Sequence, residues 1–153
     1  MIVYRITTGI YAKDISGEGA RLAGGRWNTA GLSVLYTSQH ISLSILEILV
    51  KADKITAPDN YTIVTIEFPD DKNFSVINLS ELKLNWQNHL AYTQWIGDQF
   101  IKNNEHLVLK IPSAIVPQEH NFLINPLHKD FKKVKIVGTE LLELDKRLLQ
   151  TQQ

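Results

Sequence analysis

Short β-rich segments recur along the chain, and those in which apolar and polar residues alternate have the period of a strand with one buried face. Pro69 and Pro126 follow two of these segments and end them, because proline cannot donate to a sheet. The segments expected to form strands are residues 2–7, 33–37, 61–68, 74–79, 107–111 with an extension over 114–116, 121–125, 134–138 and 140–144. This pattern predicts about seven strands.

Two longer segments have the apolar spacing of α-helices. The first covers residues 41–52, with Ser38 as its capping residue, and the second covers residues 86–102 and ends at an Asn-Asn pair. Residues 9–31 hold six of the eight glycines and are expected to form a long loop. Strands and helices come in runs rather than in strict alternation, which predicts an α+β domain rather than a doubly wound sheet.

The first predicted helix is apolar on two opposite sides, so we expect it to be largely buried. The two apolar sides consist of Ile41, Ile45, Ile48, Leu49 and Ala52, and of Leu43, Leu46 and Val50. The narrow polar stripe that remains consists of His40, Ser44, Glu47 and Lys51. Either this stripe faces solvent, with Glu47 and Lys51 paired one turn apart, or it faces a pocket in which Glu47 stabilises positive charge.

Composition and charge narrow the classes of function. The chain has 153 residues, which suits one domain with a sizeable core. Its 16 Lys and Arg balance 16 Asp and Glu, which argues against direct nucleic-acid binding. The absence of cysteine excludes disulfides and thiolate metal sites. We expect neither a membrane span nor a signal peptide, because no apolar run approaches about 20 residues and the first residues resemble a strand. The composition suits the cytoplasm.

Several single residues are candidates for chemistry or anion binding. Arg26 directly follows two glycines, so it lies either in an ordinary turn or in a loop that presents its guanidinium to an anion. Arg5 is expected to share a strand face with an apolar residue, where it needs a structural carboxylate or an anionic ligand. Tyr36 taken alone is a packing residue of a strand. Ser113 lies at a strand end, where its hydroxyl can point into a cleft, and Asn121 belongs to ordinary turn chemistry.

Histidines raise the question of a metal site or a catalytic triad. His120 and His128 are close in sequence, but no His or Glu cluster has the spacing of a zinc site, so we expect no metal. A Ser-His-Asp triad is not indicated either, because the chain has no Gly-x-Ser-x-Gly turn.

The order of several short motifs resembles the RES-domain family, the toxin halves of RES–Xre toxin–antitoxin pairs. The motifs are YR at residues 4–5, GGRWN at 24–28, LYTS at 35–38, LEIL around Glu47, TQWIGDQF at 93–100, PSAIVPQEHNFLINPLH at 112–128 and DKRLL at 145–149. Each motif is unspecific alone, and the ordered set carries the resemblance. It spans nearly the whole chain, which indicates a single RES domain over residues 1–153.

The resemblance implies an ADP-ribosyltransferase-like fold of the diphtheria-toxin type: a two-sheet β core with flanking helices around an NAD cleft. It implies an enzyme that consumes NAD as a substrate, with loss of nicotinamide to water, phosphate or another acceptor and without a prosthetic group. The catalytic residues implied are Glu47, which stabilises the ribosyl cation, Tyr36, which stacks beside nicotinamide, and Arg26. The NAD-binding residues implied are Arg5 and Arg26 at phosphates, Tyr36, Ser113 at the ribose or amide, and Asn121 as a supporting residue.

The resemblance also implies a partner and leaves alternatives open. The partner is an Xre-family antitoxin that covers the active site and itself contacts DNA, in a complex that can include a toxin homodimer. A mono-ADP-ribosyltransferase that modifies a host protein would use nearly the same residues. A non-catalytic interaction module is a third class, and the presence of Glu47 and Tyr36 argues against it. Neutral net charge argues against a ribonuclease.

Overall fold

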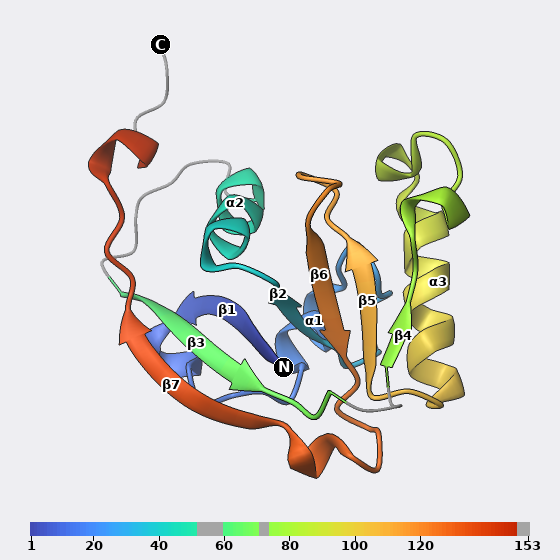
Figure 1. The fold of residues 1–153 in the computed structure, drawn as a ribbon, viewed down its shortest axis with the longest axis horizontal. Helices are drawn as coiled ribbons and strands as arrows, with labels where there is room; N and C mark the ends of the chain where they lie inside the picture. The colour runs from blue at the N-terminus through green and yellow to red at the C-terminus, as the bar shows by residue number, and fades with distance from the viewer. Residues whose placement is uncertain (52–59, 71–73, 150–153) are drawn as a thin grey trace.

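The computed structural model describes residues 1–51, 60–70 and 74–149, and the structural statements below concern these residues. The strands are β1 (Ile2–Thr8), β2 (Leu35–Ser38), β3 (Tyr61–Glu67), β4 (Phe74–Val76), β5 (Val108–Pro112), β6 (His120–Ile124) and β7 (Lys135–Leu141). The helices are α1 (Glu18–Ala23), α2 (Ile41–Lys51) and α3 (Leu90–Asn103), with short 3-10 helices η1 (Gly9–Tyr11), η2 (Leu79–Glu81), η3 (Trp86–Asn88), η4 (Phe131–Lys133) and η5 (Lys146–Leu149). The predicted α+β class is confirmed (Figure 1).

No helix within these ranges is long and apolar enough to cross a bilayer.

The strands of the described ranges form one seven-stranded sheet in the order β4-β5-β6-β2-β1-β3-β7 (Figure 1). Neighbours are antiparallel except for β4 and β5, which run parallel. The expectation of two separate sheets is therefore wrong, because hydrogen bonds connect the strands from edge to edge. The connection is narrow at one place: β1 and β2 face each other only at Tyr4 and Ser38. The sheet thus consists of two halves, β4-β5-β6-β2 and β1-β3-β7, that share one short joint.

Several predicted boundaries change because of contacts that are distant in sequence. Ser38 does not cap α2: it is the last residue of β2, and its hydroxyl donates to the side chain of Asn121, which lies opposite it in β6. The expected extension of β5 over residues 114–116 does not form, because the Ser113 N–H donates to the carbonyl of Glu119 and closes a turn there. The two closing strands are one continuous strand, β7, whose register against β3 shifts between Thr65 and Ile66.

Two predicted helical or loop regions also differ from expectation. The glycine-rich segment is not a loop throughout, because α1 and η1 lie within it. The predicted helix over residues 86–102 is divided at His89 into η3 and α3. His89 takes a non-helical conformation there, with φ −119° and ψ 74°, which ends η3 before α3 begins.

Helix α2 is less buried than its two apolar sides predict. Leu43 and Ser44 are its buried residues, whereas Val50 is 68% exposed. The helix lies over β1 and β2 near their joint (Figure 1). Its Ser44 hydroxyl donates to the carbonyl oxygen of Tyr4 at 3.2 Å. Leu46 is exposed as well, although Leu43 on the same apolar side is fully buried, so the prediction of a largely buried helix is wrong. Ala52, expected on the packed side, lies outside the described residues.

The core consists of two clusters on opposite faces of the sheet. One cluster includes Val3, Leu35 and Phe122, and the other includes Trp27, Trp86 and Leu123. Successive side chains of β2 and β6 alternate between these faces, as the period of a strand requires. Tyr36 packs against the second cluster, so it lies on the face to which the glycine-rich segment and α3 contribute.

Helix α3 holds the glycine-rich segment against the sheet. The hydrogen bonds between them run from the Thr93 hydroxyl to the Arg26 carbonyl (2.6 Å), from the Gln94 amide to the Gly25 carbonyl (3.0 Å), and from the backbone and hydroxyl of Thr29 to the Asp98 carboxylate (2.9 and 2.8 Å). The two segments approach closely at Gly97, where an added Cβ would lie 1.7 Å from the carbonyl oxygen of Trp27. Glycine is therefore required in the middle of α3.

We predict that Gly97→Ala lowers the free energy of unfolding by about 2 kcal/mol, because the new methyl group forces the helix and the glycine-rich segment apart. Gly19→Ala in α1 is the matched control, since its Cβ meets nothing within 4 Å, and it should be neutral or stabilising by up to about 1 kcal/mol. Urea unfolding of both variants measures the difference. Equal effects would show that the contact between Gly97 and Trp27 does not constrain the fold.

Candidate functional site

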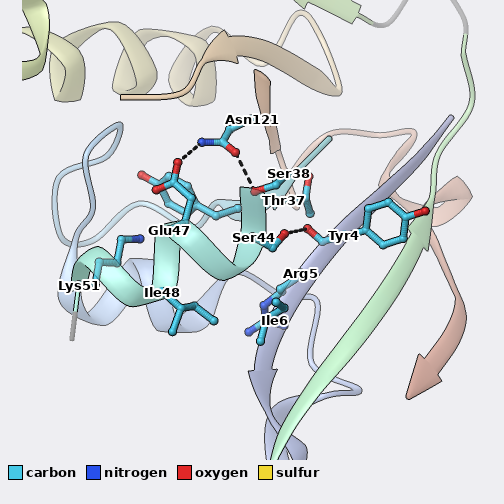
Figure 2. A pocket seen from close by; sticks show the side chains of 11 residues that line it. Tyr4, Arg5, Ile6, Thr37, Ser38, Ser44, Glu47, Ile48, Lys51 and Asn121 are labelled. Atoms are coloured by element: carbon cyan, nitrogen blue, oxygen red, sulfur yellow. Dashed lines mark hydrogen bonds between the residues drawn. The ribbon is translucent and has the colours of Figure 1, made fainter. Parts of the chain in front are cut away.

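A pocket of about 140 Å³ lies where α2 meets the joint between the two halves of the sheet (Figure 2). Residues from β1, β2, α2 and β6 line it, among them Arg5, Tyr36, Ser38, Glu47, Lys51 and Asn121. Three members of the polar stripe, Ser44, Glu47 and Lys51, line this pocket, whereas His40 is exposed and does not. Of the two interpretations of the stripe, the structure agrees with the one in which it faces a pocket.

The Glu47 carboxylate is held by one of its two oxygens. Oε1 accepts a hydrogen bond from the Ser113 hydroxyl at 3.1 Å. It accepts a second from the Asn121 amide at 2.5 Å (Figure 2). Among the described residues no donor bonds to Oε2, and Lys51 forms no ion pair with this carboxylate. Glu47 is therefore oriented by neutral donors and keeps one oxygen available to a ligand.

The two donors to Glu47 are themselves held in place. The Asn121 side-chain oxygen accepts a hydrogen bond from the Ser38 hydroxyl at 2.7 Å, so its NH₂ group must point toward Glu47 (Figure 2). The Ser113 hydroxyl accepts the backbone N–H groups of Ile115 and Val116, which directs its proton toward Glu47. Ser113 is fully buried and lies behind Glu47 rather than in the pocket lining, while Asn121 belongs to that lining.

The Tyr36 ring lines the pocket, while its hydroxyl forms two hydrogen bonds with the glycine-rich segment. The hydroxyl accepts the backbone N–H of Trp27 at 2.9 Å and donates to the side-chain oxygen of Asn28 at 2.8 Å. Burial raises the pKa of this phenol far above its ordinary value, so the group stays neutral. The Lys51 ammonium lies 5.6 Å from the centroid of the ring. The Tyr36 ring is thus a fixed, electron-rich wall that already attracts a cation.

The two candidate arginines have different positions. Arg5 lines the pocket, and its guanidinium donates to the backbone carbonyl of Asp14. Burial lowers the pKa of Arg5, and the nearby Asp14 carboxylate opposes that shift. Arg26 donates to the backbone carbonyl of Gln87 at 2.8 Å and does not line the pocket.

The second of the two glycines that precede Arg26 lies against Tyr36. A Cβ on Gly25 would lie 2.6 Å from the Tyr36 hydroxyl oxygen, so the backbone can pass this hydroxyl only as glycine. The backbone therefore does approach another group closely at this glycine, as the sequence indicates, and that group is the Tyr36 hydroxyl.

Sequence reasoning missed two residues of the site. The sequence predicts Ser38 as a helix cap, because its contact with Asn121 needs the pairing of β2 with β6, which no local pattern reveals. Lys51 belongs to the polar stripe but is not among the site residues expected from the sequence, although its place one turn after Glu47 is a signal that it faces the same pocket. Within residues 1–51, 60–70 and 74–149, no three His, Asp or Glu side chains lie close enough to hold a metal ion.

Comparison with known proteins gives consistent results. A family model described as RES domain matches residues 2–145. The chain is 33% identical over 136 residues to Toxin Res of Photorhabdus laumondii, which covers 87% of this chain and 86% of that protein. It is 37% identical over 128 residues to the Prs ADP-ribosylating toxin of a Sphingobium species, covering 81% and 80% of the two chains. A solved chain of the M. tuberculosis MbcT-MbcA toxin-antitoxin complex has a similar fold, with a TM-score of 0.70, 19% identity, and coverage of 92% of this chain and 83% of that one.

The buried Tyr36 hydroxyl predicts a specific dependence of stability on pH. The unfolded chain ionises this group near its ordinary pKa of 10.0, whereas the folded chain retains the proton to higher pH. Its contribution to stability is therefore complete below pH 10 and declines above it, by up to about 1.4 kcal/mol per pH unit.

We expect Tyr36→Phe to be less stable than the wild type at neutral pH, because the Trp27 N–H and the Asn28 side chain lose their partner. This difference should narrow as the pH rises above 10, and urea unfolding of both proteins over that range measures it. A constant difference across the range would contradict the assignment of a neutral, buried phenol.

Proposed function

This chain belongs to the RES domain family, and from that premise we propose that it is the toxin of a toxin–antitoxin pair that acts by cleaving the nicotinamide–ribose bond of NAD. The observation that carries the proposal is Glu47, a carboxylate anchored through Oε1 with Oε2 left open to the pocket. The Sphingobium relative supports it, because its name, Prs ADP-ribosylating toxin, indicates chemistry of ADP-ribose. We place this action in the cytoplasm, where NAD is found.

The proposed reaction needs a fixed negative charge more than it needs a proton carrier. The bond between nicotinamide N1 and ribose C1′ breaks, and its electron pair goes to the nicotinamide nitrogen, which becomes neutral. Positive charge then develops on the ribose, and the Glu47 carboxylate stabilises it more strongly in the transition state than in the ground state. An acceptor oxygen bonds to C1′ to complete the reaction, and a water acceptor releases its proton to solvent.

Tyr36 acts in this proposal through its ring. Its hydroxyl is already hydrogen-bonded twice and stays neutral, so it cannot serve as a general acid or base. The nicotinamide ring of NAD is cationic, and an aromatic face attracts such a cation. The contact between the Lys51 ammonium and this face marks where the cationic ring would stack.

The arginines would hold the phosphates of NAD. Arg5 is the first of them, because it lines the pocket and uses one guanidinium nitrogen on the Asp14 carbonyl, which leaves other N–H groups for phosphate oxygens. Arg26 would act from further out, through the N–H groups that Gln87 does not occupy. Ser113 and Asn121 position the carboxylate, and Asn121 can also reach a ligand from the pocket lining.

A mono-ADP-ribosyltransferase is the second candidate, and the name of the Sphingobium relative favours it specifically. The two activities share the bond that breaks and differ in the acceptor, which is water or phosphate in one case and a protein side chain in the other. Incubation of the purified protein with labelled NAD, with and without phosphate and with a cell extract, separates free ADP-ribose products from labelled protein. A non-catalytic interaction module would leave NAD intact in every arm.

An antitoxin partner follows from the same proposal, because a cell must restrain an enzyme that destroys its NAD. The solved neighbour of similar fold comes from a toxin–antitoxin complex. We propose that an antitoxin of the Xre type covers the pocket over Glu47 and Tyr36 and places a carboxylate against Arg5, where phosphate would otherwise bind. The DNA contacts of the pair would then belong to the antitoxin, in line with the neutral charge of this chain.

We predict that Glu47→Gln retains the fold and reduces the rate of nicotinamide release about 10²–10³-fold, because it removes the charge but keeps the shape. Glu67→Gln is a matched control on the exposed end of β3 and should keep the wild-type rate. Chromatography of nicotinamide measures the rate, and circular dichroism checks the fold. Near-normal turnover in a folded Glu47→Gln protein would exclude Glu47 as the catalytic carboxylate.

Antitoxin binding and NAD binding should exclude each other. We expect the purified complex to bind no NAD in isothermal titration, and Arg5→Ala to weaken both the antitoxin and NAD in the isolated toxin. If the complex binds NAD as tightly as the free toxin does, the antitoxin does not act by covering the pocket.

A further inference from the structure

The motif TQWIGDQF at residues 93–100 contributes no residue to the lining of the pocket at Glu47. It lies in α3, and its one charged residue is Asp98. The Asp98 side chain is nearly buried, with 7% of the residue exposed. Because a buried carboxylate needs hydrogen-bond donors to offset its loss of water, the donors to Asp98 indicate what this residue is for.

Both donors to the Asp98 carboxylate belong to one residue, Thr29. The backbone N–H of Thr29 donates to Oδ1 at 2.9 Å, and the Thr29 hydroxyl donates to Oδ2 at 2.8 Å. Within residues 1–51, 60–70 and 74–149, the Asp98 carboxylate forms no ion pair. Asp98 therefore holds the glycine-rich segment at two atoms of a single residue.

Thr29 directly follows the two residues that hold the Tyr36 hydroxyl, which are Trp27 and Asn28. The Asn28 side chain is fully buried, and its NH₂ group donates to three backbone carbonyls, one of which belongs to Thr29. Its side-chain oxygen is therefore fixed in the direction of Tyr36. A shift of Thr29 moves both partners of the Tyr36 hydroxyl, because the three residues are consecutive in the chain.

The position of the Tyr36 ring depends on these contacts. The pairing of β2 with β6 fixes the backbone of Tyr36, which leaves the side-chain torsions to be set by what the hydroxyl binds. A continuous series of hydrogen bonds and chain neighbours thus leads from Asp98 through Thr29 and Asn28 to the ring that lines the pocket. Asp98 can affect the pocket without lying in it.

We propose that Asp98 is a positioning residue that sets the place of the Tyr36 ring and thereby governs binding of the cationic ring of the substrate. The inference rests on the proposed function, which stacks nicotinamide on Tyr36. A displaced ring loses its attraction for the cation in the bound substrate, so the KM for NAD rises while kcat changes little. A merely structural role would act differently, because a smaller folded fraction lowers the apparent kcat and leaves KM unchanged.

The first test compares two changes at Asp98 in steady-state assays of nicotinamide release. Asp98→Ala should raise the KM for NAD about tenfold. Asp98→Asn should stay within about twofold of the wild type, because its oxygen still accepts the Thr29 N–H and its NH₂ group can donate to the Thr29 hydroxyl. Lys102→Ala is the matched control, since Lys102 is an exposed charged residue one turn further along α3.

The second test uses 1-methylnicotinamide, which carries the cationic ring without ribose or phosphates, in a titration followed by nuclear magnetic resonance. Asp98→Ala should weaken this ligand about tenfold, and Lys102→Ala should not. In a Tyr36→Phe background the Asp98→Ala change should add little, because the phenylalanine ring has no hydroxyl for the segment to hold. Thr29→Val removes only the hydroxyl contact and should give a smaller loss in the same direction, which provides a test if Asp98→Ala does not fold.

The outcomes separate this inference from the proposed function. If Asp98→Ala lowers kcat at unchanged KM, if Asp98→Asn is equally impaired, or if the losses from Asp98→Ala and Tyr36→Phe add in full, Asp98 does not position the ring. If the wild type cleaves NAD but 1-methylnicotinamide binds wild type and Asp98→Ala equally, the inference fails and the proposed function stands. If binding of 1-methylnicotinamide follows the predicted order but NAD stays intact, the positioning role stands and the proposed reaction is wrong.

Discussion

One carboxylate oxygen connects parts of the molecule that otherwise barely meet. Glu47 Oε1 accepts hydrogen bonds from Ser113 after β5 and from Asn121 in β6, while α2, which carries Glu47, packs mainly on β1 of the other half-sheet. The strands themselves join these halves at a single facing pair. Oε1 can accept both hydrogen bonds only when β5 and β6 lie beside α2, so this contact forms only with the two half-sheets in register. The pocket lies at this contact, with residues of both half-sheets in its lining.

A comparable arrangement fixes the opposite wall. The Tyr36 hydroxyl binds the Trp27 N–H and the Asn28 side chain, and α3 in turn holds that segment through Asp98. The ring is therefore presented by a chain of contacts that includes neither Glu47 nor its two donors. Electrostatic stabilisation depends on groups that need not reorganise during a reaction, and both walls meet that requirement before any ligand arrives.

The sequence predicted those features that depend on neighbouring residues. The strand periods located the strands of the described ranges, whereas the polar stripe left open whether Glu47 faces solvent or a pocket. Features that depend on distant pairing could not be predicted in this way. Ser38 resembled a helix cap until β6 placed Asn121 opposite it, and the glycines before Arg26 suggested an anion loop although Gly25 is required by the Tyr36 hydroxyl. Val50 is likewise exposed because of where α2 crosses the sheet. The spacing of apolar residues within the helix does not show where that crossing lies.

The donors that hold Glu47 lie 66 and 74 residues after it in the chain. A ribosome produces the chain from its N-terminus, and a segment cannot pair with residues that have not yet been made. Glu47 and Tyr36 therefore emerge early and remain without their final surroundings until β6 leaves the ribosome. Incomplete translation products that end before β6 lack an organised pocket, so the order of synthesis itself delays the pocket until β6 has been made.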